Sequence, residues 1–259
     1  MAIIREFRDR IFTITLHRPE RLNALDSESF SELLSALLEA EGLGAKVVVI
    51  KGSKGTFCSG ADLVEFGQAE DTPQKVLQMV SLFNRIVSQI RRMDSIVVAL
   101  IQGKAIGGGF SLAIASDLVV ASESALFNPG YMRIAFTPDG GATYFLTKAV
   151  GGKKALEMFL LCEDMTAREA QGLGLVNFVF DDAEFEVQSG RLIERLRDLP
   201  DEAALLTKRL LNEVAAQDLE GHLEREKLSV VRTAQSEDFR KRLRDFLQKR
   251  RVHRLSDGS

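Results

Sequence analysis

The sequence is poor in cysteine, in tryptophan and in long apolar runs: its 259 residues include two cysteines and no tryptophan. Two cysteines outside any paired motif argue against a disulfide scaffold and fit a reducing compartment, so we expect a cytoplasmic protein. No run of about 18 apolar residues exists, and charges interrupt the first ten residues, so neither a membrane span nor a signal peptide is expected. The formal net charge of −3 implies no general attraction to nucleic acid or to a membrane surface.

Histidine is also scarce. None of the three histidines has a partner at metal-ligand spacing, so the sequence predicts no metal site.

The basic stretch "FRKRLRDFLQKRRVHR" (239–254) lacks the aromatic interleaving of a nucleic-acid-binding segment. We therefore interpret most of its charges as a solvated helix face and predict no nucleic-acid partner.

Strand-like and helix-like segments alternate through about residue 129. "AIIREF" and "IFTITLH" predict a hairpin, and "AKVVVIKG" and "SIVVALIQG" predict buried parallel strands. Between them, Asp26 and Thr72 stand at the starts of segments whose apolar residues recur at helical spacing. This alternation is typical of an α/β core with right-handed crossovers.

The second half of the chain is mostly helical in pattern. Short helices are predicted over 139–150, 153–161 and 166–172, and the pattern from 181 to 251 is almost entirely helical. We therefore predict a core over residues 1–195 and a helical C-terminal portion over residues 196–259.

Two glycine-containing loops carry the strongest chemical signal: "CSGAD" (Cys58–Asp62) and "IGGGF" (Ile106–Phe110). Each loop follows an apolar strand and precedes a helical stretch, and ligands bind at the carboxyl ends of strands in open α/β sheets. Either loop alone is explained by glycines that pack in a tight turn, and neither matches a nucleotide-binding motif. Together they could direct two backbone N–H groups at one oxygen, as in an oxyanion hole.

The order and spacing of six motifs resemble those of the crotonase superfamily, the enoyl-CoA hydratases and isomerases. The resemblance implies a spiral of stacked ββα units followed by a helical C-terminal portion that forms a homotrimer or a dimer of trimers. The motifs are "RPERLNAL" (18–25), "FCSGADL" (57–63), "GKAIGGGFSLAIASD" (103–117), "TPDGGATYFLTKAVG" (137–151), "MTAREAQGLGLVN" (165–177) and "SEDFRKRLRDFLQKR" (236–250).

The same resemblance implies an acyl-CoA thioester as substrate. The backbone N–H groups of Ala61 and Gly108 would hold its thioester oxygen, and no separate cofactor is expected because CoA is part of the substrate. Arg21 and Lys249 would approach the CoA phosphates, with Phe246 beside Lys249. The remaining residues expected to contact the substrate are Leu22, Ala24, Asp62, Leu63, Ser111 and Tyr131.

Both glutamates of the family's hydratases are missing from this sequence. The position three residues after Gly108 holds Ser111, and the position after Pro129 holds Gly130. Hydration needs a base that activates water and an acid that protonates carbon. Neither serine nor glycine supplies such a group, so the usual hydratase machinery is absent.

Asp139 is the acidic residue that remains in this region, in "TPDGGATYF". Its bland interpretation is a helix N-cap; branches of the family that shift double bonds place a carboxylate at its position. One carboxylate suffices for a 1,3-proton shift, and an apolar pocket would exclude water. Four phenylalanines are candidate pocket residues or core residues, namely Phe66, Phe110, Phe136 and Phe145.

Three functions stay open from the sequence. The favoured one is an enoyl-CoA double-bond isomerase that uses Asp139 as its proton shuttle. The alternatives are a non-catalytic or weakly active acyl-CoA-binding homologue, and an atypical hydratase that uses Asp139 with water. The dehalogenating branch also places an aspartate near Asp139, but it needs a histidine in the middle helix, and Thr72–Arg92 contains none.

Overall fold

A computed structural model describes residues 2–213 of the chain. The chain divides into two compact units, residues 1–197 and residues 198–259, which we describe separately. In the second unit the described element is helix α9 (Asp201–Glu213). None of the helices within the described residues has the length and apolar character needed to cross a membrane.

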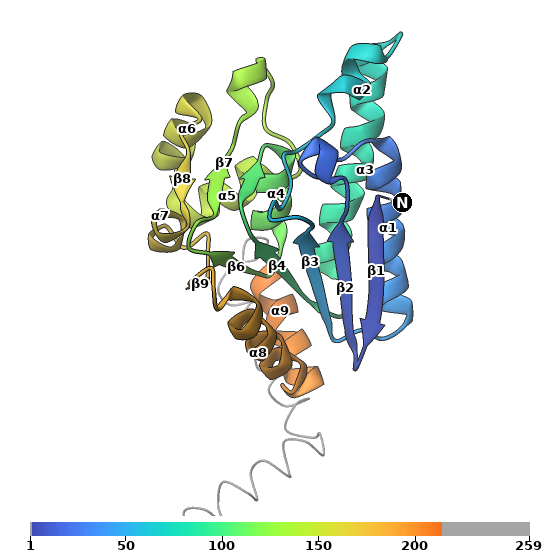
Figure 1. Ribbon diagram of the computed structural model, residues 1–259, viewed down its shortest axis with the longest axis vertical. Coiled ribbons are helices and arrows are strands. Elements are labelled where there is room, and N and C mark those ends of the chain that lie inside the picture. The colour runs from blue at the N-terminus through green and yellow to red at the C-terminus, as the bar shows by residue number, and fades with distance from the viewer. Residues whose placement is uncertain (1, 214–259) are drawn as a thin grey trace, which may run out of the picture. The chain divides into compact units, whose positions relative to one another are not determined.

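The first unit is built on a mainly parallel sheet (Figure 1). Strands β1 and β2 form an antiparallel hairpin, and every later strand of this sheet runs parallel to its neighbour. The predicted hairpin and the predicted buried parallel strands are therefore confirmed. In spatial order the strands are β1 (Ile3–Arg8), β2 (Ile11–Leu16), β3 (Val47–Gly52), β4 (Ile96–Ile101), β6 (Leu118–Ser122) and β9 (Phe178–Phe180).

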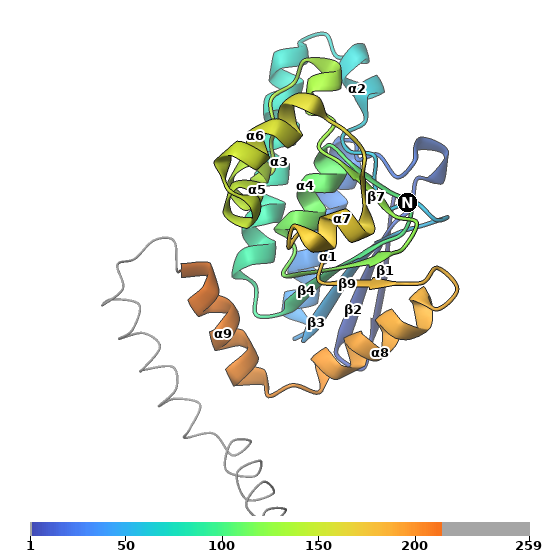
Figure 2. The same cartoon turned by 90° about the vertical axis from the view of Figure 1, so that its left-hand side faces the viewer.

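Helices cover both faces of this sheet, which explains why its central strands are apolar throughout. Alternate residues of β3 face opposite ways: Val48 and Ile50 join the larger core, and Val47 and Val49 join a smaller one. The larger core includes residues of α1 (Ser27–Gly42), α3 (Thr72–Arg92) and α4 (Gly108–Ala115) and of three shorter helices named below, and α8 (Phe185–Arg197) closes the smaller core. Figure 2 shows α8 on the face of the sheet opposite to the one that α1, α3 and α4 cover.

A second, three-stranded sheet brings two distant loops together. It consists of β5 (Lys104–Ile106), β7 (Leu126–Asn128) and β8 (Met165–Thr166). Because β5 and β7 are parallel and pair Ile106 with Asn128, the residues that follow them lie side by side. Gly107 N donates to Asn128 O at 3.0 Å, so the glycine loop after β5 is joined to the Pro129–Gly130 turn.

Short helices surround these loops: the 3₁₀ helices η1 (Pro19–Arg21) and η2 (Tyr131–Ile134), and α2 (Leu63–Gln68), α5 (Ala142–Val150), α6 (Gly152–Leu161) and α7 (Ala167–Gly172).

The helix predicted over 139–150 begins three residues later than expected. Its first residue is Ala142, its N-cap is Gly141, and no side chain caps it. Gly140 and Gly141 have φ angles of 58° and 75°, a left-handed conformation that separates Asp139 from the helix. The N-cap interpretation of Asp139 is therefore wrong, and its carboxylate is available for another role.

Candidate active site

The two glycine-containing loops are held against each other by backbone pairing. Cys58 forms a parallel bridge with Ala105: Cys58 N donates to Lys104 O at 3.0 Å, and Ile106 N donates to Cys58 O at 2.9 Å. Gly109 permits this approach, since a Cβ there would lie 2.2 Å from Cys58 O. The Cys58 side chain is fully buried, which raises the pKa of its thiol to about 12 against the opposing effect of the Gly60 N–H. Cys58 is thus a packing residue.

A second bridge, between Leu25 and Ala61, fixes the direction of the Ala61 amide. Leu25 N donates to Gly60 O at 2.8 Å, and Asp62 N donates to Leu25 O at 2.9 Å. Within the described residues, neither the Ala61 N–H nor the Gly108 N–H donates to a protein acceptor. A Cβ built on Gly108 would lie 3.7 Å from Ala61 N, so the two amides are close together. Two adjacent amides with no protein acceptor are the arrangement that an oxyanion hole requires.

Arg18 joins the first loop to the start of α2, a role that the sequence analysis did not assign. Its Nη2 lies 2.9 Å from Asp62 Oδ2 and 3.1 Å from Asp26 Oδ2, and its Nη1 donates to Ala24 O at 2.7 Å. Asp62 caps α2 by accepting from Val64 N. Asp62, predicted to contact CoA, therefore has its side chain engaged in holding the oxyanion loop.

A cavity of about 200 Å³ opens directly in front of the two amides. Phe66 and Phe136 stack on its wall with ring centroids 6.1 Å apart, so of the two roles that the sequence left open these residues line the pocket while also packing against the core. Phe110 and Phe145 do not line it; Phe110 is fully buried in the core. The cavity is lined by Phe30, Ser59, Gly60, Ala61, Leu63, Phe66, Phe83, Ile106, Gly107, Gly108, Gly130, Tyr131, Arg133, Ile134, Phe136 and Asp139. In the sequence, Phe30 and Phe83 belong to sets of apolar residues at helical spacing, and this pattern predicts only that they pack in the core.

Asp139 and Tyr131 form the polar part of this cavity. Tyr131 Oη donates to Asp139 Oδ1 at 2.8 Å, and Ser111 Oγ lies 2.5 Å from Tyr131 Oη. Burial raises the pKa of Asp139, although the hydrogen bond from Tyr131 acts in the opposite direction. Burial and the neighbouring Asp139 charge both raise the pKa of Tyr131, so its phenol remains protonated. Among the described residues that line the cavity, Asp139 is the one that carries a carboxylate.

Ser111 does not reach the cavity, contrary to the predicted contact with substrate. Its side chain is fully buried and engages Tyr131 instead. The backbone at Gly130 is left-handed, with φ of 70°, and a Cβ there would lie 2.9 Å from Ile106 Cγ2. At position 130 a side chain would therefore be strained by the left-handed backbone, and at position 111 the side chain is engaged with Tyr131.

The predicted CoA-binding loop borders the cavity without lining it. Ser59, which does line it, donates from its backbone N to Leu22 O at 3.1 Å and from its Oγ to Arg21 O at 3.3 Å. Arg21 and Leu22 therefore contact a residue of the cavity wall, and CoA contacts of Arg21, Leu22 and Ala24 remain a prediction. Leu63 is half exposed and lines the cavity. Phe246 and Lys249 lie outside the described residues.

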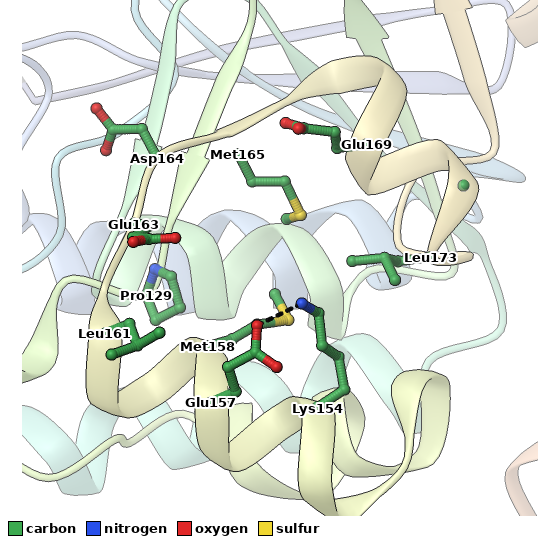
Figure 3. A pocket seen from close by; sticks show the side chains of 11 residues that line it. Pro129, Lys154, Glu157, Met158, Leu161, Glu163, Asp164, Met165, Glu169 and Leu173 are labelled. Atoms are coloured by element: carbon green, nitrogen blue, oxygen red, sulfur yellow. Dashed lines mark hydrogen bonds and ion pairs between the residues drawn. The ribbon is translucent and has the colours of Figure 1, made fainter.

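A larger cavity, of about 410 Å³, lies between α6 and α7, away from these amides (Figure 3). Met158, Leu161, Met165 and Leu173 provide its apolar surface, and Lys154 pairs with Glu157 across 2.6 Å at one side. Its other charged lining residues are all carboxylates, namely Glu163, Asp164 and Glu169. An excess of negative charge disfavours the anionic phosphates of CoA, so we assign the active site to the smaller cavity, which has the two amides.

Comparison with known proteins gives consistent matches along the whole chain. Residues 6–254 match the family described as enoyl-CoA hydratase/isomerase. A probable enoyl-CoA hydratase of Rhodobacter capsulatus is 34% identical over 248 residues, 96% of this chain and 95% of that protein. A 4-chlorobenzoyl coenzyme A dehalogenase of Arthrobacter is 30% identical and covers 94% and 90% of the two chains. A relative from Thermobifida fusca YX, solved with acetoacetyl-CoA, shares 30% identity and a TM-score of 0.83, with coverage of 91% and 96%.

Proposed function

The chain belongs to the enoyl-CoA hydratase/isomerase family and has the crotonase-like fold, and on that premise we propose that it is an enoyl-CoA double-bond isomerase. The observation that carries the proposal is the position of Asp139, a single partly buried carboxylate that lines the same cavity as Ala61 and Gly108. In this assignment the thioester oxygen accepts from the two amides, and the acyl chain lies against Phe66 and Phe136.

The reaction needs one group that both takes and returns a proton. The Asp139 carboxylate removes a proton from the carbon next to the thioester carbonyl, and the electrons of the broken C–H bond enter a dienolate whose oxygen is held by the two amides. The protonated Asp139 then delivers the same proton two carbons further along, which leaves the double bond conjugated with the carbonyl. The raised pKa of Asp139 suits this exchange, because a carboxyl whose pKa lies nearer to neutral pH both takes up and releases a proton more readily.

Hydration is the less favoured alternative. It requires an acid and a base on opposite sides of a bound water, and Asp139 is the one carboxylate among the residues that line the cavity. Dehalogenation, the activity in the name of the Arthrobacter relative, has no support from a histidine in α3, since Thr72–Arg92 contains none. An acyl-CoA-binding protein without activity remains the second candidate, and it would have no use for a buried carboxylate in the acyl cavity.

The test compares 3-enoyl-CoA with 2-enoyl-CoA thioesters by ultraviolet absorbance. An isomerase increases the absorbance of the conjugated thioester when supplied with 3-enoyl-CoA, whereas a hydratase decreases the absorbance of 2-enoyl-CoA. Asp139→Asn keeps the size of the side chain and cannot take up a proton, so turnover should fall about 100-fold or more with acyl-CoA affinity retained.

The matched control is Glu163→Gln, which removes a carboxylate from the larger cavity and should leave turnover unchanged. Full turnover in Asp139→Asn would overturn the proposal. Calorimetric binding of acyl-CoA without any absorbance change would favour the binding protein instead.

A further inference from the structure

We propose that Tyr131 is a positioning residue: its hydroxyl holds Oδ1 of Asp139 and leaves Oδ2 to move the proton. The inference rests on the proposed function, because it concerns how the proton shuttle is oriented and ionised. Tyr131 is 5% exposed and does not depend on solvent for its hydrogen bonds. Its hydroxyl oxygen lies between two side chains, 2.8 Å from Asp139 Oδ1 and 2.5 Å from Ser111 Oγ.

The direction of the hydrogen bonds follows from counting protons. A phenol has one proton to donate, and the carboxylate of Asp139 is an acceptor without a proton of its own. Tyr131 therefore donates to Asp139, and its oxygen accepts from Ser111 at 2.5 Å. A serine hydroxyl also has one proton, so in this arrangement Ser111 gives it to Tyr131 and not to Gly107 O, the more distant acceptor at 3.3 Å. The chain Ser111 to Tyr131 to Asp139 has a single direction, and it ends on one named oxygen of the carboxylate.

Burial keeps the Tyr131 phenol protonated, which is the form that donates a hydrogen bond. Burial, followed by the Asp139 charge, raises the pKa of Tyr131, so the phenol does not ionise in the range where Asp139 titrates. Tyr131 thus cannot replace Asp139 as a base. Its hydrogen bond favours the charged form of Asp139 and offsets part of the effect of burial. Without Tyr131 the carboxylate would be both less firmly oriented and harder to ionise.

The charged groups of the surrounding elements that form ion pairs or hydrogen bonds form them with partners other than Asp139. Arg133, on η2, donates to Cys162 O at 2.8 Å and lies 3.3 Å from Asp164 Oδ1. The ion pairs of the neighbouring helices are Glu65 with Lys75, on α2 and α3, and Arg91 on α3 with Asp117, each at 3.1 Å. Lys148, on α5, donates to Tyr144. Among the described residues, Tyr131 is therefore the side chain that donates to the Asp139 carboxylate.

The experiment is Tyr131→Phe, measured as the pH dependence of kcat/KM for the isomerase reaction. Activity requires ionised Asp139 in the free enzyme, so it falls as pH decreases through the pKa of that group. Loss of the phenol hydroxyl should move this acidic limb to higher pH. It should also lower kcat by about 10-fold to 100-fold, the range expected for one hydrogen bond to a charged group. Ser111→Ala acts through Tyr131 and should shift the limb in the same direction by a smaller amount.

Tyr144→Phe is the matched control, because Tyr144 is half exposed, lies on α5 and does not line the cavity. It should leave the pH profile and kcat unchanged. The ¹³C chemical shift of the Asp139 carboxyl, assigned through Asp139→Asn, reports the same pKa without any turnover and should show the same upward shift in Tyr131→Phe.

The outcomes separate the two proposals. An unchanged pH profile, carboxyl titration and kcat in Tyr131→Phe, with Asp139→Asn inactive, would refute the role of Tyr131 and leave the isomerase assignment in place. A shifted carboxyl titration in Tyr131→Phe, with Asp139→Asn fully active, would support the hydrogen bond and refute the isomerase assignment.

Discussion

A methyl group added at Gly108 should inactivate the site without unfolding the protein. The Cβ of Gly108→Ala would lie 3.6 Å from Gly60 Cα and 3.7 Å from both Ala61 N and Phe83 Cε1, all ordinary van der Waals distances. The protein can therefore accept the substitution. The new methyl nevertheless stands beside the Ala61 amide, in the space where an acceptor oxygen would sit about 2.9 Å from that nitrogen.

The size of the effect follows from the loss of one oxyanion donor. Such a loss typically costs about 2.7–4 kcal/mol of transition-state stabilisation, which corresponds to a 10²-fold to 10³-fold decrease in kcat. Stability should stay the same or rise by up to about 1 kcal/mol, because Gly108 is the first residue of α4 and alanine is the better helix former. Gly108→Val extends the same methyl further and should also abolish acyl-CoA binding.

Gly109→Ala is the contrasting variant, one residue away. Its Cβ would lie 2.2 Å from Cys58 O and 2.8 Å from Cys58 C, which are backbone atoms of the bridge between the loops. We expect it to lower the free energy of unfolding by about 1–3 kcal/mol or more, as overpacking does. Isomerase turnover, calorimetry with acetyl-CoA and urea unfolding together distinguish the two variants. A Gly108→Ala protein with full turnover would show that the amides are not where the substrate oxygen binds. A Gly108→Ala protein as destabilised as Gly109→Ala would instead contradict the expectation that the methyl group fits.

Two further predictions concern stability. Arg18→Met should lower the free energy of unfolding by about 1–3 kcal/mol in urea titration, because it removes a charged donor and leaves the carboxylates of Asp26 and Asp62 partly buried; an unchanged midpoint would contradict this role. Asp139→Asn should raise the stability at neutral pH, because the raised pKa of Asp139 means that its charged form is disfavoured in the folded state. This gain should shrink as the pH falls through the raised pKa and vanish below 3.8, the ordinary value; a gain that grows in acid would refute the reasoning.

The sequence predicted well those features that depend on the backbone. Apolar runs on β3 and β4 are buried on both faces, so their continuous hydrophobicity specified parallel strands without ambiguity. The glycines at 107–109 permit a left-handed turn and the close approach to Cys58, and both requirements are properties of single positions in the chain. The pairing of the two loops could therefore be expected from motif order alone.

The features that the sequence did not predict depend on side chains that meet across turns. The sequence Asp-Gly-Gly before an apolar run is good capping chemistry, but two consecutive left-handed glycines turn Asp139 away from the helix and toward Tyr131. The contact of Tyr131 with Ser111 spans twenty positions and follows no periodicity. Arg18 likewise contacts Asp62 across 44 positions. Such contacts depend on the packing of separate elements, which local patterns do not encode.

The backbone features and the side-chain contacts have different roles in the proposed site. The proposed oxyanion hole consists of backbone amides, so it would persist wherever the loop pairing persists, and family membership is informative about it. The proposed reaction depends on side chains from η2 and the turn before α5, where this chain departs from the hydratase pattern. Restoring a glutamate at position 130 would require a left-handed residue whose Cβ meets Ile106, and one at 111 would displace the hydroxyl that supports Tyr131. On this proposal the reaction class depends on the whole segment from Tyr131 to Asp139, and we expect that two glutamate substitutions alone would not produce hydratase activity.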